Sequence, residues 1–147
     1  QFLGYWGQPG VPKTMRIGNW LRSGDLALRD ADGYFWYQGR NDELIKSAGY
    51  RIGPAEVEDT LSRHPKVAEA AVVGRPNKER GQVVVAFVRL AQQVDPTSEL
   101  KQELQEYVKV NLAYYKYPRE VIFVESFPMT SSGKIRRKAL REQFDNE

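Results

Sequence analysis

Two neighbouring apolar runs constrain the fold of this chain more than any other feature. They are VAEAAVVG, at residues 67–74, and QVVVAFVRL, at residues 82–90, and both are rich in β-branched residues. Such residues favour strands, because a branched side chain packs well on a pleated surface. The sequence therefore predicts a small β-sheet that includes both runs.

Shorter segments on either side predict further elements. ELIKSAGYRI, at residues 43–52, predicts a pair of short strands, and VIFVESF, at residues 121–127, predicts a last strand. A helix is predicted over residues 54–64, because Pro54 suits a first helical turn. Strands and helices thus alternate along this part of the chain.

A second helix is predicted over residues 96–112 and a third over residues 134–144. In the second helix, large side chains at helical spacing are expected to face inward: Leu100, Leu104, Tyr107 and Val108. The predicted fold is α+β, a small C-terminal domain in which helices cover a short, mainly antiparallel sheet. We expect this domain to span residues 42–147.

Residues 1–41 differ from the rest. The segments LALRD and YFWYQ flank Ala31, Asp32 and Gly33, which predicts a β-hairpin whose turn uses the positive φ of glycine. A small hairpin unit rich in tryptophan cannot bury its own faces. We therefore expect residues 1–41 to be the incomplete end of a larger N-terminal domain. The chain begins at Gln1 without an initiator methionine, which we interpret as an interior start.

Composition narrows the possible chemistry. The 22 Lys and Arg residues against 19 Asp and Glu give a net charge of +3, which mildly favours anionic ligands. There is no cysteine, which excludes a disulfide and a thiolate nucleophile, and with His64 as the single histidine no metal site is expected. We expect His64 to cap a helix end. No apolar run of about 18 residues is present, so neither a membrane span nor a location outside the cytoplasm is expected.

The segment PMTSSGKIRRKAL, at residues 128–140, holds one lysine on a turn of small residues before a basic helix. Gly133 permits a tight bend, and Lys134 offers a compact positive charge on a flexible stem to phosphate or carboxylate oxygens. The segment is not a phosphate-binding P-loop, because it lacks the leading glycine and no Ser or Thr follows Lys134. An ordinary solvated loop with a surface lysine is the alternative.

Five motifs in order carry a family resemblance: RSGD, GRNDELIK, GYRIGPAEVE, KYPR and PMTSSGK. Together they resemble the C-terminal part of an acyl-CoA synthetase of the adenylate-forming superfamily, most closely the medium-chain acyl-CoA and aryl-CoA ligases. The resemblance covers nearly the whole chain. It implies that a carboxylic acid reacts with ATP to give an acyl-adenylate and pyrophosphate, after which coenzyme A displaces AMP. ATP, Mg²⁺ and coenzyme A are the ligands that it implies.

The resemblance also implies residues for the first reaction. Asp25 would bind the ribose of ATP, and Arg40 the ribose or a phosphate. Lys134 would contact the acyl carboxylate and the phosphate during adenylation. Asp42 would be the hinge about which the C-terminal domain turns between the two reactions. The alternatives are a turn-forming Asp25, a surface ion pair for Arg40 and a turn cap for Asp42.

For the second reaction the resemblance implies a coenzyme A site. A strand formed by Ala48, Gly49, Tyr50 and Arg51 would line the pantetheine channel, with Arg51 contacting a phosphate in one conformation. Many relatives have Ser where Ala48 stands, so a side-chain hydrogen bond there is not implied. The nucleotide end would contact Arg80, Lys109 and Tyr117. Lys109 could instead lie on a polar helix face, and Tyr117 could belong to the core.

Other functions remain open at this point. The domain could deliver the acyl group to the pantetheine of a carrier protein, or it could be a non-catalytic module that binds coenzyme A or a nucleotide. A nucleic-acid partner is disfavoured, because aromatic residues do not alternate with the basic cluster that starts at Lys134. The acyl pocket would lie before Gln1, so the fragment alone is expected to be inactive. Lys134 is also a possible target of a lysine acetyltransferase and deacetylase.

Overall fold

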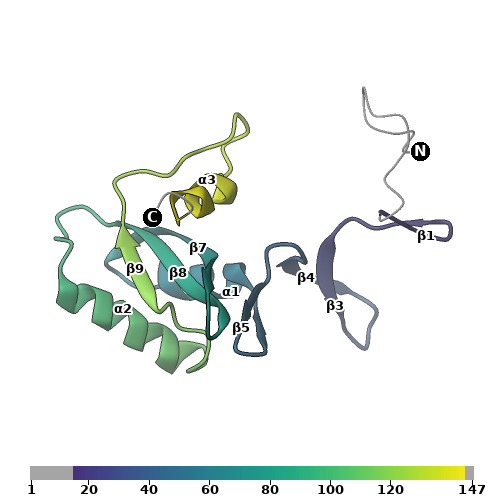
Figure 1. Ribbon diagram of the computed structural model, residues 1–147, viewed down its shortest axis with the longest axis horizontal. Helices are drawn as coiled ribbons and strands as arrows, with labels where there is room; N and C mark the ends of the chain where they lie inside the picture. The colour runs from purple at the N-terminus through teal and green to yellow at the C-terminus, as the bar shows by residue number, and fades with distance from the viewer. Residues whose placement is uncertain (1–14, 145–147) are drawn as a thin grey trace. The chain divides into compact units, whose positions relative to one another are not determined.

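The computed structural model describes residues 15–144. The chain divides into two compact units, Gln1–Asp42 and Glu43–Glu147, which are described separately (Figure 1). The observed division falls one residue after the boundary that the sequence analysis placed between residues 41 and 42.

The described residues of the first unit, 15–42, form two small antiparallel pairs. Strand β1 (Arg16–Ile17) pairs with β2 (Trp20–Leu21), and β3 (Asp25–Arg29) pairs with β4 (Phe35–Arg40). The β3–β4 turn is closed by Asp30, whose carboxylate accepts hydrogen bonds from the Tyr34 backbone at 2.8 Å and from the Trp36 indole at 2.7 Å. Gly33 has a φ of +92°. The predicted hairpin is confirmed.

Apolar side chains of the first unit remain exposed. Trp20 is 79% exposed and Phe35 is 73% exposed, and no described residue of this unit is buried. Large exposed apolar surfaces usually mark a place where another molecule or another part of the protein binds. The unit therefore lacks a core of its own among the described residues.

The second unit contains a five-stranded sheet. Its strands are β5 (Ile45–Ser47), β6 (Tyr50–Ile52), β7 (Val67–Asn77), β8 (Gly81–Leu90) and β9 (Glu120–Phe123). The order is β6-β5-β8-β7, and β9 also pairs with β8. All these pairs are antiparallel except β8 with β9, which is parallel.

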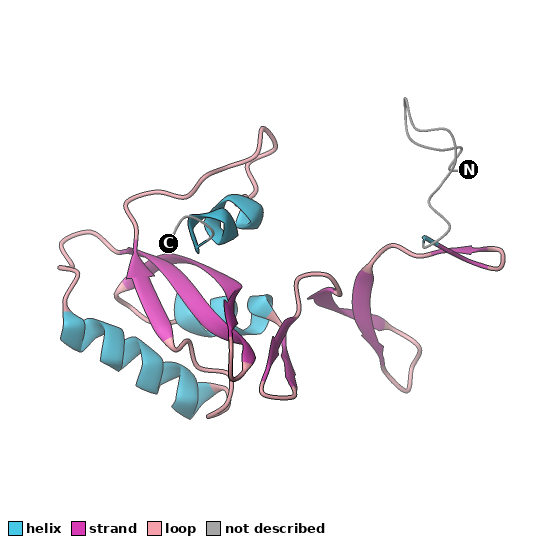
Figure 2. Ribbon diagram, viewed as in Figure 1, coloured by secondary structure: helices cyan, strands magenta, loops and turns pink. Residues whose placement is uncertain are grey.

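Helices cover both faces of this sheet. They are α1 (Pro54–Ser62), α2 (Ser98–Asn111) and the short α3 (Arg137–Arg141), after which a 3₁₀ turn covers Glu142–Phe144. Figure 2 shows α1 and α2 on one side of the sheet and α3 on the other. The predicted α+β fold is confirmed.

Burial on both faces explains the continuous apolar runs of β7 and β8. Val72, Val84 and Ala86 pack with residues of α1 and α2, whereas Val85 and Phe87 pack with Leu140 of α3. Successive strand residues point to opposite faces, so a strand that is covered on both sides needs apolar residues at consecutive positions.

Three elements differ from their predictions by three residues or more. Strand β7 continues to Asn77, three residues past its predicted end. The last helix begins at Arg137 and not at residue 134, because residues 129–135 close a turn of their own in which Met129 pairs with Ile135. The last strand ends at Phe123, four residues earlier than predicted. In α2, Leu100, Leu104 and Val108 are buried as predicted, but Tyr107 is only partly buried and its ring lies nearly perpendicular to the His64 ring.

Candidate functional site

Lys134 lies at the end of a tight turn that its own backbone closes. The Thr130 amide donates to the Lys134 carbonyl at 2.8 Å, and the Lys134 amide donates to the Thr130 hydroxyl at 3.0 Å. Gly133 has a φ of +76° and an added Cβ would meet nothing within 4 Å, so the backbone conformation and not space demands glycine. The turn holds the exposed Lys134 side chain at its rim.

Asp25, Arg40 and Asp42 form a charged cluster in the first unit. Asp25 and Arg40 are partners across the β3–β4 hairpin, and their side chains lie 3.3 Å apart. The Arg40 guanidinium also donates to the Asp42 carboxylate at 3.0 Å and to the Ser23 carbonyl at 3.1 Å. The structure thus brings together three predicted site residues.

These carboxylates hold the Arg40 charge firmly. The hydrogen bond to Asp42 and the charge of Asp42, followed by the charge of Asp25, raise the pKa of Arg40 above its ordinary range. An open hollow of about 420 Å³ lies beside Arg40 and is also lined by Arg22, Ser23, Gly24, Asn41 and Asp42. This geometry suits a polar ligand, and it also contains the surface ion pair that was the alternative for Arg40.

The predicted strand through Ala48, Gly49, Tyr50 and Arg51 is wrong for its first two residues. Ala48 and Gly49 form the two-residue turn between β5 and β6, with φ values of +48° and +85°. Positive φ at both central residues produces the tight turn that suits the twist of a hairpin. Tyr50 and Arg51 lie in β6, as predicted.

Arg80 lies beside this turn. The Ala48 amide donates to the Arg80 carbonyl at 2.9 Å, and Ser47 pairs with Gly81 at the start of β8. An added Cβ on Gly81 would lie 3.3 Å from the Lys46 carbonyl, so the two backbones approach closely. The fold therefore joins the β5–β6 turn to Arg80, which the sequence analysis had assigned to the same ligand.

A tyrosine cluster that the sequence analysis did not identify packs against Tyr50. The Tyr50 and Tyr115 rings stack at 4.2 Å, and Tyr114 meets Tyr115 edge-on at 5.5 Å. Interaction with Tyr114, through a hydrogen bond and charge, raises the pKa of Tyr50 above its ordinary value of 10.0. Tyr50 is 43% exposed and Tyr114 is 70% exposed. The adjacent tyrosines in YYKY were the available signal.

Lys109 and Tyr117 also come together. The Lys109 ammonium lies 4.4 Å from the centroid of the Tyr117 ring and pairs with Glu106, and the Arg119 guanidinium lies 5.1 Å from the same ring. Tyr117 is partly buried against the core. The alternatives to a coenzyme A contact were a polar helix face for Lys109 and a place in the core for Tyr117. The structure is compatible with both alternatives, since Lys109 lies on the outer face of α2 and Tyr117 lies at the edge of the core.

His64 has a structural environment. It is buried, its Nδ1 accepts from the Lys66 amide at 3.3 Å, and its Nε2 lies 3.2 Å from a Glu103 oxygen. Because Nδ1 is an acceptor, the proton of the neutral ring belongs on Nε2, facing the carboxylate. Among residues 15–144 no group of three or more acidic or histidine side chains could hold a metal ion.

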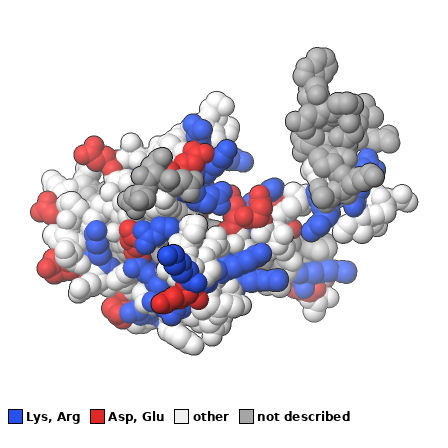
Figure 3. Space-filling view, viewed as in Figure 1, with Lys and Arg blue, Asp and Glu red and all other residues white. Residues whose placement is uncertain are grey.

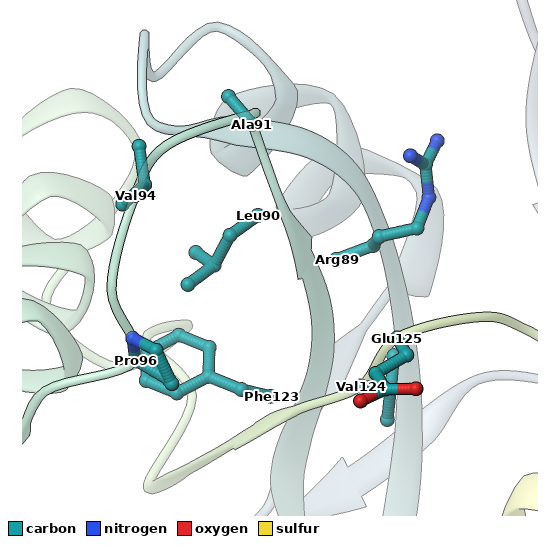
Figure 4. Close-up of a pocket in the computed structure, with 8 residues that line it drawn as sticks. All are labelled: Arg89, Leu90, Ala91, Val94, Pro96, Phe123, Val124 and Glu125. Atoms are coloured by element: carbon teal, nitrogen blue, oxygen red, sulfur yellow. The ribbon is translucent and has the colours of Figure 1, made fainter.

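A second hollow, of about 560 Å³, lies elsewhere in the second unit, where Leu90, Pro96 and Phe123 gather at the ends of β8 and β9 (Figure 4). None of the predicted site residues lines it.

Lys and Arg side chains gather in a band across the visible face of the second unit, with acidic side chains among them (Figure 3). Within the part of the chain that the structure describes, no helix is long and apolar enough to cross a membrane.

Comparisons with known proteins agree with one another. A family model described as the AMP-binding enzyme C-terminal domain matches residues 56–134. An acyl-CoA ligase of Bacillus subtilis, YtcI, named as uncharacterized, is 49% identical over 142 residues, which cover 97% of this chain and 27% of that protein. The mouse mitochondrial acyl-coenzyme A synthetase ACSM1 is 46% identical over 144 residues, which cover 97% of this chain and 25% of that protein.

Solved structures give the same result. An ATP-bound chimera, RpMatB-BxBclM B1, matches 97% of this chain and 28% of its own with a TM-score of 0.89 and 35% identity. The acyl-CoA synthetase of Brucella canis matches 97% of this chain and 26% of its own with a TM-score of 0.71 and 43% identity. The chain spans about a quarter of the length of the curated relatives it matches. It belongs to the AMP-binding enzyme C-terminal domain family, which confirms the resemblance seen in its motifs.

Proposed function

We propose that this chain is the C-terminal part of an ATP-dependent acyl-CoA ligase. The observation that carries the proposal is Lys134, exposed at the rim of a self-closed turn in a domain of the AMP-binding family. In the first reaction a carboxylate oxygen attacks the α-phosphorus of ATP, and the bond to the bridging oxygen breaks to release pyrophosphate. In the second, the sulfur of coenzyme A, after loss of its proton, attacks the acyl carbon, and AMP leaves.

Lys134 would act in the first reaction. Negative charge on the phosphate oxygens is redistributed as the new bond forms, and a positioned ammonium stabilises the transition state. The turn supplies the positioning, because both backbone groups of Lys134 are hydrogen-bonded to Thr130 and the residue is exposed. The carboxylic acid itself would be bound by residues outside this chain.

Asp25 and Arg40 would hold the nucleotide. A carboxylate can accept hydrogen bonds from both hydroxyls of a ribose, and a guanidinium can donate to ribose or phosphate oxygens. Arg40 already orients Asp25 from across the hairpin, so this pair is preformed. The exposed aromatic residues of the first unit support the proposal that a larger N-terminal domain packs against it.

The coenzyme A site would be built on the β5–β6 hairpin. The Ala48–Gly49 turn offers backbone with little side-chain bulk, which suits close approach of the pantetheine arm. Arg51, Arg80 and Lys109 are cations suited to the phosphates, and Tyr50 and Tyr117 are the neighbouring rings. Asp42, the last residue of the first unit, would be the hinge that lets the second unit serve both reactions.

Mg²⁺ would arrive with ATP. The described residues contain no group able to hold a metal ion without the nucleotide, so the phosphate oxygens would supply its ligands.

An acetyltransferase could neutralise the charge of the exposed Lys134 and a deacetylase could restore it. Mass spectrometry of the Lys134 peptide after incubation with an acetyltransferase tests this.

We propose the cytoplasm as the location. Some relatives are named as mitochondrial, so cell fractionation must compare the two compartments.

The acceptor of the acyl group needs its own test. The amide bond synthetase McbA from Marinactinospora thermotolerans matches 89% of this chain at 35% identity with a TM-score of 0.78, so this architecture also occurs in an enzyme whose name specifies a different product. The predicted phosphate contacts Arg80 and Lys109 favour free coenzyme A. Supplying the full-length protein with acyl-adenylate and either coenzyme A, a pantetheinylated carrier protein or an amine identifies the acceptor.

The experiment that tests the proposal is Lys134→Ala in the full-length parent. We expect carboxylate-dependent ATP–pyrophosphate exchange to fall by at least about 100-fold, which is the usual effect of losing one preorganised charge donor. Thioester formation from a pre-made acyl-adenylate should persist. Exchange that survives in Lys134→Ala would show that Lys134 is an ordinary loop residue.

A further inference from the structure

Arg137, the first residue of α3, makes a two-pronged contact with α1. Its Nε donates to one oxygen of Glu58 at 3.2 Å and its terminal nitrogen donates to the other at 2.7 Å. The side chains of Glu58 and Arg137 are 13% and 26% exposed. A forked guanidinium–carboxylate pair that is largely shielded from water fixes orientation as well as distance.

The sheet holds the Glu58 carboxylate in place. The Val72 amide, in the buried middle of β7, donates to Glu58 at 2.7 Å. The same oxygen that receives this bond also receives the Arg137 Nε. Glu58 is therefore not a mobile surface carboxylate but a fixed point to which α3 is attached.

The same guanidinium reaches the start of the second unit. A terminal nitrogen of Arg137 lies 3.7 Å from a Glu43 carboxylate oxygen, and Glu43 is the first residue of that unit. Arg137 thus connects the residue that follows Asp42, helix α1 and the first turn of α3. A movement of the backbone at Asp42 that carries Glu43 would carry α3 with it.

The Lys134 turn needs such an anchor. Residues 129–134 are exposed, and the turn stands out from the sheet in Figures 1 and 2. Its own hydrogen bonds fix its shape but not its direction, because they run from one part of the turn to another. The fixed contacts that follow it are the partly buried Ile135 and the forked pair at Arg137, three residues after Lys134.

We propose that Glu58 and Arg137 are positioning residues that orient the Lys134 side chain for adenylation, and that Glu43 links this orientation to the first residue of the second unit. None of these three residues, Glu43, Glu58 and Arg137, would touch the substrate. The inference rests on the function proposed above, because it assigns the pair to the first reaction. A displacement of a reacting group by about 1 Å can cost about 100-fold in rate, so a small change in the direction of α3 would suffice.

Arg137→Lys in the full-length parent tests the proposal. Lysine keeps the positive charge beside Glu58 but loses the fork. We expect ATP–pyrophosphate exchange to fall by about 10- to 100-fold, while thioester formation from a pre-made acyl-adenylate and the melting temperature stay at their original values. Arg136→Lys is the matched control, since Arg136 is exposed and adjacent, and it should leave both reactions unchanged.

The outcomes separate this proposal from the function on which it rests. Exchange lost in Lys134→Ala but retained in Arg137→Lys overturns the positioning role alone. Exchange retained in Lys134→Ala overturns both. Equal losses of both reactions in Arg137→Lys would make the pair merely structural. If Arg137→Lys lowers the melting temperature, the paired replacement Glu58→Gln with Arg137→Met removes both charges but keeps an acceptor oxygen for the Val72 amide, and the same split between reactions is required.

Discussion

Ala48 adopts a backbone conformation that residues with a Cβ normally avoid. Its φ is +48° in the β5–β6 turn, where the left-handed conformation costs an L-residue about 1 kcal/mol or more. We expect Ala48→Gly to increase the free energy of unfolding by up to about 1 kcal/mol, less the greater entropy of glycine in the unfolded chain. Urea unfolding of the 147-residue chain measures the change.

Gly49→Ala is the matched control for this prediction. Gly49 has a φ of +85° and an added Cβ would meet nothing within 4 Å, so the substitution adds backbone strain without a clash. It should lower the free energy of unfolding by about 1 kcal/mol. A loss of stability in both variants would mean that the Ala48 methyl group makes a contribution that outweighs its strain.

Single residues were predictable from the sequence where the neighbouring residues determine their role. The small residues around Lys134 indicated an exposed lysine on a turn, and the structure has that turn. The Glu58–Arg137 pair was not predictable, because its partners lie 79 residues apart and meet only when α1 and α3 pack on the same strand. For the same reason the stacking of Tyr50 on Tyr115 was missed.

Helix α2 begins at a cap that its sequence specifies. The Thr97 hydroxyl accepts a hydrogen bond from the Leu100 amide at 3.2 Å, which satisfies one of the unpaired donors of the first turn. Thr97→Ala should lower the free energy of unfolding by about 1 kcal/mol. Thr97→Ser keeps the acceptor oxygen and should restore most of this loss, as urea unfolding would measure. Equal losses in the two variants would point to the threonine methyl group instead.

Elements whose apolar residues follow a clear pattern, periodic in α2 and continuous in β7 and β8, were the ones predicted best. Helix α2 and strands β7 and β8 follow their predictions closely because their apolar positions match surfaces that become buried. Helix α3 starts at Arg137 because both backbone groups of Lys134 are bonded to Thr130 and the Arg136 amide is bonded to the Pro128 carbonyl, which keeps the residues before Arg137 out of the helix. The Ala48–Gly49 turn was overlooked because alanine rarely takes a positive φ.

At the scale of the whole molecule, the proposed mechanism depends on the division of the chain after Asp42, because the two reactions would need the second unit in different orientations. The sequence indicated two units because only the second contains enough apolar pattern for a core, and the structure divides the chain within one residue of the expected boundary. The larger N-terminal domain expected to cover the exposed rings of the first unit stays a prediction, because the rings show only that the described residues of this unit do not bury them.

Asp42→Pro in the full-length parent tests whether this boundary is a hinge. Proline fixes φ near −65° and restricts the residue before it, so the backbone at position 42 could no longer change its angles freely. We expect thioester formation to fall by about tenfold or more relative to ATP–pyrophosphate exchange, because in the mechanism proposed above the second unit would turn about position 42 between the two reactions. Asp42→Ala is the control: it removes the 3.0 Å bond to Arg40 but leaves the backbone free, and should keep the ratio of the two rates. Equal losses of both reactions in Asp42→Pro would indicate a folding defect, and an unchanged ratio would place the hinge elsewhere.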